Sequence, residues 1–312
     1  MQSYMASKVN NGMPTLIPED MTAETLYECN LAVEIILEAR SNQEQTKWNA
    51  NNYIEHLSER CTGRNDAVED NLKNLFPPIH LPMLYRCKPG TVADSEGNIL
   101  AWYLPGILTE RRVNSTWKML QNIEGLIRMT PSSTSWRANK TYFRHESAWL
   151  RPGNANFSPA WFQQGHEQSN PLEVSADLTH PDGLSFIAGL MTTSALIGAI
   201  LSIIHPAQFR AGIEFLERIS SQPEIIHKAE LLKHILTFWT SPFGVISVIS
   251  NRDTPFHRDN GSCHPWYDLL MPLGNYENGR IELPGVGIRL VLERLGVSKA
   301  GWSTSSDILQ NL

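Results

Sequence analysis

The 312-residue chain has little cysteine and no two cysteines close together in the sequence. Its four cysteines lie far apart, at Cys29, Cys61, Cys87 and Cys263. This spacing suits neither a disulfide framework nor a thiolate zinc site, and it predicts reduced thiols in an intracellular protein. The first residues also lack the basic and apolar regions of a secretory signal, so we expect none.

An excess of positive charge is also missing. With 26 Lys and Arg against 32 Asp and Glu, the net charge is −6, so the whole chain carries no electrostatic footprint for nucleic acid. One segment departs from this balance, because eight basic and only two acidic residues lie between Arg111 and Arg151, interleaved with five aromatic residues. Cations with stacking rings predict a DNA-facing surface at Arg137, Lys140 and Arg144. A solvated face over core aromatics is the alternative.

Charged residues are absent from Gly183 to Pro206. The segment is long enough to span a bilayer, but serines and threonines dilute it and no Lys or Arg anchors flank it. We therefore expect a buried core helix that Pro206 stops, and no membrane partner.

Hydrophobic periodicity elsewhere predicts both helices and short strands. Helices are expected from residue 22 to 37 and over residues 47–61, 109–129, 210–219 and 224–239. Strands are expected over residues 79–85, 99–104, 245–249, 266–270 and 280–283, with a turn at 94–97. Residues 1–18 are polar, and we expect them to be mobile. The prolines at 77 and 78 mark a boundary between a helical, partly disordered N-terminal region, 1–75, and a larger domain, 76–312.

A possible metal-binding pattern follows the apolar run Val245–Ile249, which we expect to be a buried strand. After a turn come His257 and Asp259, two positions apart and therefore on one face if the segment is extended. A histidine and a carboxylate are two of the three ligands in a facial triad that holds Fe(II). The alternative is a loop histidine beside a turn aspartate. A second His-x-Asp, His180-Pro181-Asp182, precedes the charge-free segment, and there we expect Asp182 at a helix N-terminus instead.

The amino-acid sequence around this pattern resembles the TET/JBP family of 2-oxoglutarate/Fe(II) dioxygenases, and most of all its expanded basidiomycete fungal members. The resemblance runs from about Pro77 to Leu290. It rests on AWYLPG (101–106), FSPAWFQQGH (157–166), SALIGAI (194–200), NRDTPFHRDN (251–260) and NGRIELPGVGIRL (278–290).

The resemblance implies an α+β fold in which a double-stranded β-helix, or jelly roll, is packed with helices. It also implies oxidation of 5-methylcytosine in duplex DNA, with Fe(II) and 2-oxoglutarate as cofactors and an intracellular, nuclear location. His257 and Asp259 would be iron ligands, and Asn260 could face the flipped base. Arg252 and Arg258 could reach a phosphate, with a structural salt bridge as the alternative.

One expected feature is missing from the sequence. The family places a third ligand, a late histidine, and a 2-oxoglutarate-binding arginine downstream of His-x-Asp, but no histidine follows His264. We therefore expect a domain truncated after about residue 290 and an inactive chain. His264 is the only local substitute for the third ligand, with a turn residue as the favoured alternative, and we expect His166 to be a hydrogen-bonded loop histidine. The alternative function is a degenerate, non-enzymatic module that binds nucleic acid or a partner protein.

Overall fold

The computed structural model describes residues 1–11, 17–19, 21–57, 71, 74–79, 84–130, 137, 139–144, 150–162, 169–254, 266–274, 279–292 and 307–309. The chain forms two compact units. Unit 1 comprises residues 1–33 and 108–252, and unit 2 comprises residues 34–107 and 253–312. The predicted boundary near residue 75 stays a prediction, because each unit combines segments that are distant in sequence.

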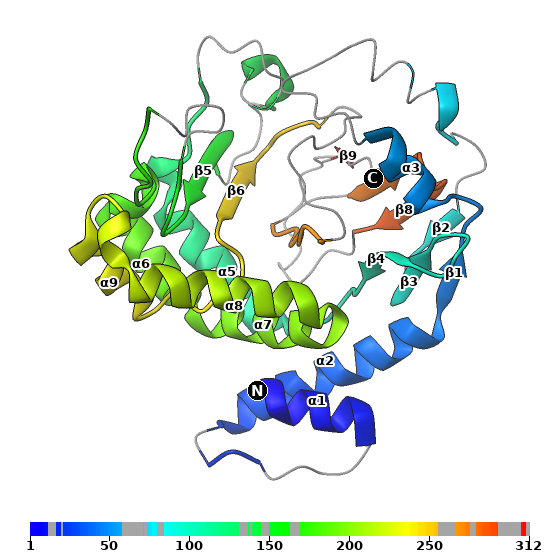
Figure 1. The fold of residues 1–312 in the computed structure, drawn as a ribbon, viewed down its shortest axis with the longest axis horizontal. Coiled ribbons are helices and arrows are strands. Elements are labelled where there is room, and N and C mark those ends of the chain that lie inside the picture. Colours follow the sequence, from blue (N-terminus) through cyan, green and yellow to red (C-terminus); the bar gives the residue numbers. More distant parts are fainter. Residues whose placement is uncertain are drawn as a thin grey trace. The chain divides into compact units, whose positions relative to one another are not determined.

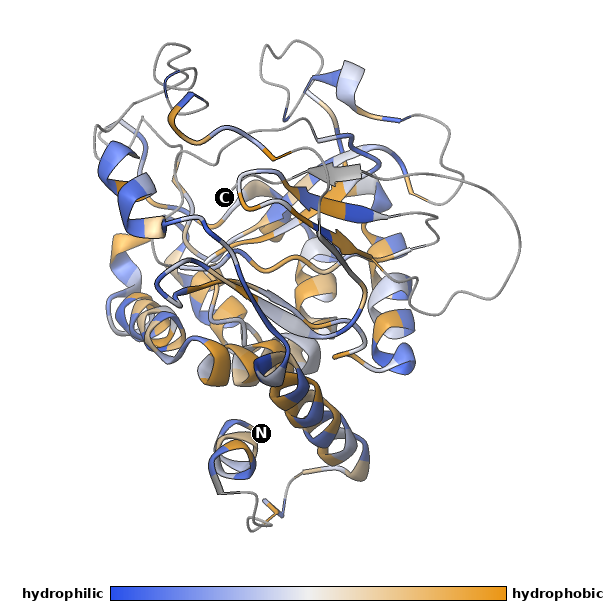
Figure 2. Ribbon diagram, turned by 90° about the vertical axis from the view of Figure 1, so that its right-hand side faces the viewer, coloured by the Kyte–Doolittle hydropathy of each residue, from blue (hydrophilic) through white to orange (hydrophobic). Residues whose placement is uncertain are grey.

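Helices make up most of unit 1 (Figure 1). They are α1 (Gln2–Asn11), the first part of α2 (Ala23–Ser41), α5 (Glu110–Asn122), α6 (Pro181–Gly189), α7 (Met191–Ile204), α8 (Pro206–Ser221) and α9 (Ala229–Leu236). In Figure 2, α2 is the long helix beside the N-terminal label, and it carries both hydrophobic and hydrophilic residues. The predicted helices at 22–37, 109–129, 210–219 and 224–239 are confirmed, with shifted ends.

The expectation of a mobile segment over residues 1–18 is wrong where α1 forms. Tyr4 and Met5 are buried, and α1 lies against α7. The Tyr4 hydroxyl donates a hydrogen bond of 2.8 Å to Oδ1 of Asn30. Burial of these two side chains stabilises a helix that its own polar composition would leave marginal.

The charge-free segment forms two helices rather than the single one expected. α6 and α7 meet at Leu190 with a bend of 52°. As expected, the helix of the charge-free segment ends just before Pro206, because the last residue of α7 is Ile204. Pro206 also begins α8, a position where proline's missing N–H costs nothing. The prediction of a core role is confirmed, since eight of the 14 residues of α7 are buried. Among the described residues no single helix is long and apolar enough to cross a membrane, although the bent pair α6–α7 passes on length and composition.

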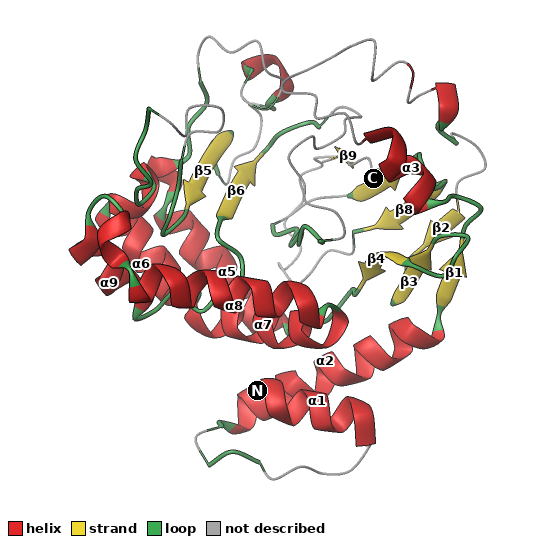
Figure 3. Cartoon of the chain, in the orientation of Figure 1, coloured by secondary structure: helices red, strands yellow, loops and turns green. Residues whose placement is uncertain are grey.

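Two strands accompany these helices. β5 (Gly153–Phe157) and β6 (Ile246–Ser250) lie side by side and antiparallel, with Ala155 opposite Val248 (Figure 3). The strand predicted at 245–249 is confirmed, but its predicted burial is wrong because the Ile249 side chain is 50% exposed. Within the described residues β6 pairs only with β5, so one strand supplies its backbone partners.

Unit 2 holds most of the strands and the helix α3 (Ala50–Leu57). One sheet has the order β1 (Gln43–Gln45), β3 (Gly90–Ala93) and β4 (Ile99–Tyr103). The other has the order β2 (Leu84–Arg86), β8 (Ile288–Val291), β7 (Arg280–Leu283) and β9 (Asp307–Leu309). The two sheets share a core that includes Val92 and Tyr103 from the first sheet and Ile288 from the second.

These elements test the remaining strand predictions. Strands at 99–104 and 280–283 are confirmed, and the end of the one expected at 79–85 is confirmed as β2, while residues 80–83 lie outside the described residues. The strand expected at 266–270 is wrong. There the Tyr267 hydroxyl donates a hydrogen bond to the carbonyl of Ile99, 2.7 Å away, while Trp266 and Leu269 stay exposed. The mixed helix-and-sheet class is confirmed, and the described strands form three separate sheets rather than a closed barrel.

Candidate nucleic-acid interface and metal-binding segment

The end of β6 is held in an unusual backbone conformation. Asn251, the next residue, has a φ of 54°, in the left-handed region that asparagine tolerates better than most residues. Its side-chain amide donates to the carbonyl of Leu150 at 2.6 Å and to Oγ of Ser250 at 3.0 Å. The turn that follows β6 is therefore fixed by side-chain hydrogen bonds as well as by its sequence.

A basic turn lies beside this strand end. We use this name for Arg137 together with residues 139–144, which contain the three predicted DNA-facing cations. Its C-terminal end is fastened to β6, because the Arg144 amide donates to the Asn251 carbonyl at 2.8 Å and Phe143 forms an antiparallel bridge with Arg252. The Phe143 side chain is buried, so the turn also has an apolar anchor.

The N-terminal end of the basic turn is held through one carbonyl oxygen. The carbonyl of Arg137 accepts a hydrogen bond from Nη1 of Arg252 and another from Nδ2 of Asn154, both at 3.2 Å. Arg252 thus directs one nitrogen toward main chain, and its predicted contact with phosphate stays a prediction. The structure brings Arg137, Arg144 and Arg252 into one neighbourhood of unit 1.

Lys140 projects from the middle of the basic turn. It begins the short 3₁₀ helix η2 (Lys140–Tyr142), which Asn139 caps by accepting hydrogen bonds from the amide and the hydroxyl of Thr141, at 3.0 and 2.8 Å. The side chains of Arg137 and Lys140 are exposed, and that of Arg144 is half-buried. The exposed side chains of Arg137 and Lys140 therefore extend from a backbone that is fastened at both ends.

Other cations of the basic segment are committed to carboxylates within unit 1. Arg112 binds buried Glu28 with two nitrogens, at 2.9 and 2.6 Å. This hydrogen bonding raises the pKa of the Arg112 guanidinium against the opposing effect of burial. Arg128 lies 2.7 Å from Asp177, and Arg111 lies 3.1 Å from Glu24. These three pairs support the fold more than a DNA surface.

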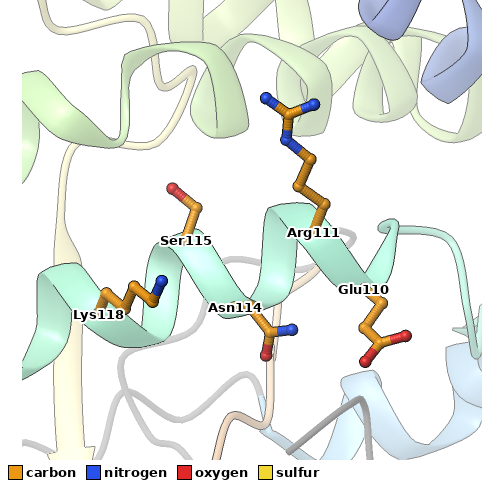
Figure 4. Close-up of a pocket in the computed structure, with 5 residues that line it drawn as sticks. All are labelled: Glu110, Arg111, Asn114, Ser115 and Lys118. Carbon is orange, nitrogen blue, oxygen red and sulfur yellow. The ribbon is translucent and has the colours of Figure 1, made fainter.

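A shallow pocket lies on α5 and is lined by described residues. Its lining residues are Glu110, Arg111, Asn114, Ser115 and Lys118 (Figure 4). Arg111 and Ser115 point to one side of the helix and Glu110 and Asn114 to the other. The lining mixes both charge signs and gives Ser115 no histidine base, so it lacks the nucleophile–base pair that acyl-transfer chemistry needs.

The predicted ligands His257 and Asp259 lie outside the described residues, as do Arg258, Asn260, His166 and His264. In the described ranges, no three His, Cys, Asp or Glu side chains are grouped to hold a metal. The donor chemistry itself fits, because an imidazole nitrogen and a carboxylate oxygen suit Fe(II). His257 follows Arg252 by five residues, so the segment leaves unit 1 at the fastened strand end.

The second His-x-Asp behaves as predicted. His180 caps α6, and its Nδ1 accepts a hydrogen bond of 3.2 Å from the Asp182 amide. Asp182 lies in the first turn of that helix, where its negative charge interacts favourably with the helix dipole. This pair therefore has a structural role, and it provides a natural control for the other pair.

Sequence reasoning did not find the fastening residues Asn251, Asn154 and Phe143. Asn251 meets Leu150 across 101 positions, and Arg252 meets Arg137 across 115. The turn signal at 251–255 was visible in the sequence, but only the fold identifies its partners.

Comparison with known families gives one match. The model named Tet_JBP, described as the oxygenase domain of the 2OGFeDO superfamily, matches residues 158–298. The match contains β6, Asn251, Arg252 and the His-x-Asp segment, whereas the basic turn lies before it in the sequence. It confirms the resemblance over these residues and implies a jelly-roll fold and use of Fe(II) and 2-oxoglutarate. The fungal subgroup and the truncation stay predictions. No curated protein matches the chain.

Proposed function

Because residues 158–298 match the oxygenase domain of the 2OGFeDO superfamily, we propose that this chain is a dioxygenase-like module whose ligand is duplex DNA containing 5-methylcytosine. The observation that carries the proposal is the position of His257 and Asp259 within the matched segment, directly after β6 and its turn. A nuclear location follows from this substrate.

In this proposal His257 and Asp259 hold Fe(II) through an imidazole nitrogen and a carboxylate oxygen. The bound iron and 2-oxoglutarate supply the oxidising chemistry. Asn260 offers an amide that can hydrogen-bond the Watson–Crick edge of a base taken out of the duplex. Arg258 lies between the two ligands in sequence and adds a positive charge suited to the neighbouring phosphate.

The basic turn supplies the DNA contact. Arg137 and Lys140 expose their cationic side chains, and Arg144 is fastened beside them. Each phosphate neutralised releases counterions, so binding should weaken steeply as salt rises. The net charge of −6 makes this local surface, rather than the whole chain, the source of attraction.

The number of ligands decides between catalysis and binding. No histidine follows His264 in these 312 residues, so a polypeptide of these residues alone brings two ligands of the expected triad. We propose that this polypeptide binds methylated duplex without oxidising it. The alternative function, a non-enzymatic module that binds nucleic acid or a partner protein, is favoured by the same observation.

The test combines DNA binding with turnover. Purified protein is titrated with methylated duplex at several salt concentrations, and is then incubated with Fe(II), ascorbate, 2-oxoglutarate and the same duplex. We expect salt-sensitive binding and no 5-hydroxymethylcytosine above a His257→Ala control. Product above that control would contradict the proposed lack of turnover. Absence of DNA binding would contradict the proposed substrate and leave the partner-protein alternative.

A further inference from the structure

The basic turn is fastened to the strand end by two neighbouring residues that differ in charge. Asn251 is neutral, and it holds the C-terminal end of the turn through its carbonyl, which accepts the Arg144 amide at 2.8 Å. Arg252 is cationic, and its Nη1 holds the N-terminal end through the carbonyl of Arg137 at 3.2 Å. The residues of the turn that face solvent lie between these two attachments.

The conformation of Asn251 is what directs its carbonyl toward the turn. A residue with a φ of 54° points its neighbouring peptide groups differently from a strand residue, and most side chains disfavour that region. The amide hydrogen bonds to Leu150 and Ser250 compensate for this cost. Loss of the side chain should therefore release the turn as well as the strand end.

We propose that Asn251 and Arg252 are positioning residues, which hold the backbone of the basic turn in the geometry that lets Arg137, Lys140 and Arg144 meet consecutive phosphates. This inference rests on the proposed DNA-binding function and assigns Arg252 a different role from a phosphate ligand. Arg252 acts through its hydrogen bond to the main-chain carbonyl of Arg137. Asn251 acts through its own carbonyl, which accepts the Arg144 amide, and it carries no charge that could attract a phosphate.

The salt dependence of DNA binding distinguishes positioning from direct contact. A phosphate ligand lost by mutation reduces the slope of log K against log salt by about 1. Loss of a neutral residue that positions several cations should also reduce this slope, because the displaced cations no longer neutralise phosphates. A residue with a role only in overall stability would leave the slope unchanged in protein that remains folded.

The experiment uses the full chain with Asn251→Ala, Asn251→Gly and Arg252→Gln. Asn251→Gly keeps the left-handed backbone accessible but loses the amide, so it separates conformation from hydrogen bonding. Arg252→Gln loses the charge and, because glutamine is two bonds shorter, also loses the donor that reaches the Arg137 carbonyl, so its effect on amide exchange separates positioning from phosphate contact. Ser247→Ala is the matched control, because it removes a 2.8 Å hydrogen bond to Asn156 in the same strand pair without touching the turn. Affinity for duplex is measured over a range of salt, and amide exchange is followed over residues 139–144.

Positioning predicts that Asn251→Ala lowers the salt slope by about 1 to 2 and speeds exchange in the turn by roughly tenfold, with Asn251→Gly intermediate. Arg252→Gln should also lower the slope and speed exchange in the turn, whereas Ser247→Ala should leave the slope within about 0.3 of the wild-type value. A slope reduced by Arg252→Gln with unchanged exchange in the turn would overturn the proposal for Arg252 and make Arg252 a phosphate contact. Unchanged exchange in Asn251→Ala would also overturn it.

The exchange measurement needs no DNA, so it separates the two hypotheses. If wild-type protein binds no duplex but Asn251→Ala still speeds exchange in residues 139–144, the positioning of the turn is supported and the proposed DNA function fails. If wild-type protein binds duplex and Asn251→Ala changes neither slope nor exchange, the DNA function stands and the positioning role fails.

Discussion

At the scale of single residues, buried charges in this chain are satisfied by several donors rather than by one. Glu28 is 1% exposed and receives two hydrogen bonds from Arg112 and one from Thr109. Asp94 is also buried and accepts hydrogen bonds from three backbone amides and from the side chain of Asn98. Such groups are costly to bury without partners, so each pair or cluster makes a testable contribution to stability.

Replacement of Arg112 by alanine should destabilise unit 1 strongly, because it leaves the Glu28 carboxylate buried without its cation. The loss should be about 3 kcal/mol in the free energy of unfolding measured with denaturant. Arg111→Ala is the matched control, since Arg111 is adjacent but its side chain is 80% exposed in the pair with Glu24. That variant should change stability by less than about 0.5 kcal/mol, and equal effects of the two would contradict the assigned role of the buried pair.

Asp94 should make stability depend on pH at the acidic end. Burial acts to raise the pKa of this carboxyl, but the hydrogen bonds from Asn98, Ala50 and Glu96 outweigh it and lower the pKa. A lowered pKa in the folded state gives stability that is present above the unfolded value of about 3.9 and is lost as pH falls through the folded value. The difference in unfolding free energy between wild type and Asp94→Asn should therefore shrink below about pH 4. A constant difference would contradict this.

At the scale of elements, periodicity predicted helix locations better than helix ends. The charge-free run of 24 residues, 183–206, gave no sign of the break at Leu190, because every residue there is compatible with a buried helix. The bend lies where α6 packs against α5, with Gly189 close to Met119, and such contacts are absent from a local pattern. Likewise, proline at 206 was correctly predicted to end a helix, but the next helix, predicted from residue 210, begins at this proline and is capped by His205.

Close packing between α8 and the segment before β6 should make Gly212 intolerant of a side chain. A Cβ at this position would lie 2.0 Å from the carbonyl oxygen of Pro242, a backbone atom that cannot rotate away. Gly212→Ala should destabilise the protein by about 1–3 kcal/mol despite the better helix propensity of alanine. Gly125→Ala is the control, since nothing lies within 4 Å of its Cβ. A thermal melt in which both variants match wild type would refute the close approach.

At the scale of the whole molecule, the sequence indicated the α+β class and the family but not the order of strands. β1 pairs in parallel with β3, and β2 pairs in parallel with β8, across about 200 positions in the second case. Nonlocal pairings of this kind are chosen by packing of the complete core, so no window of sequence contains them. The basic turn shows the same limit, since its cations were predicted from composition and their attachment to β6 was not.

The candidate metal ligands His257 and Asp259 were predicted from their spacing and from the family resemblance of the sequence around them. The family match supports the segment, while the pair lies outside the described residues and its geometry stays a prediction. The structural role of the control pair, His180 and Asp182, follows from local interactions, because proline at the first helical position makes His180 a cap. The effects of mutating His257 and His180 on iron binding can therefore be compared directly.

Anaerobic equilibrium dialysis with Fe(II) tests the central claim most directly. The wild-type chain and His180→Ala should bind one iron per chain with equal affinity. His257→Ala should bind at least about tenfold more weakly, because it removes an iron ligand rather than a supporting contact. Equal binding by wild type and His257→Ala, or a loss confined to His180→Ala, would contradict the assignment of the metal-binding segment.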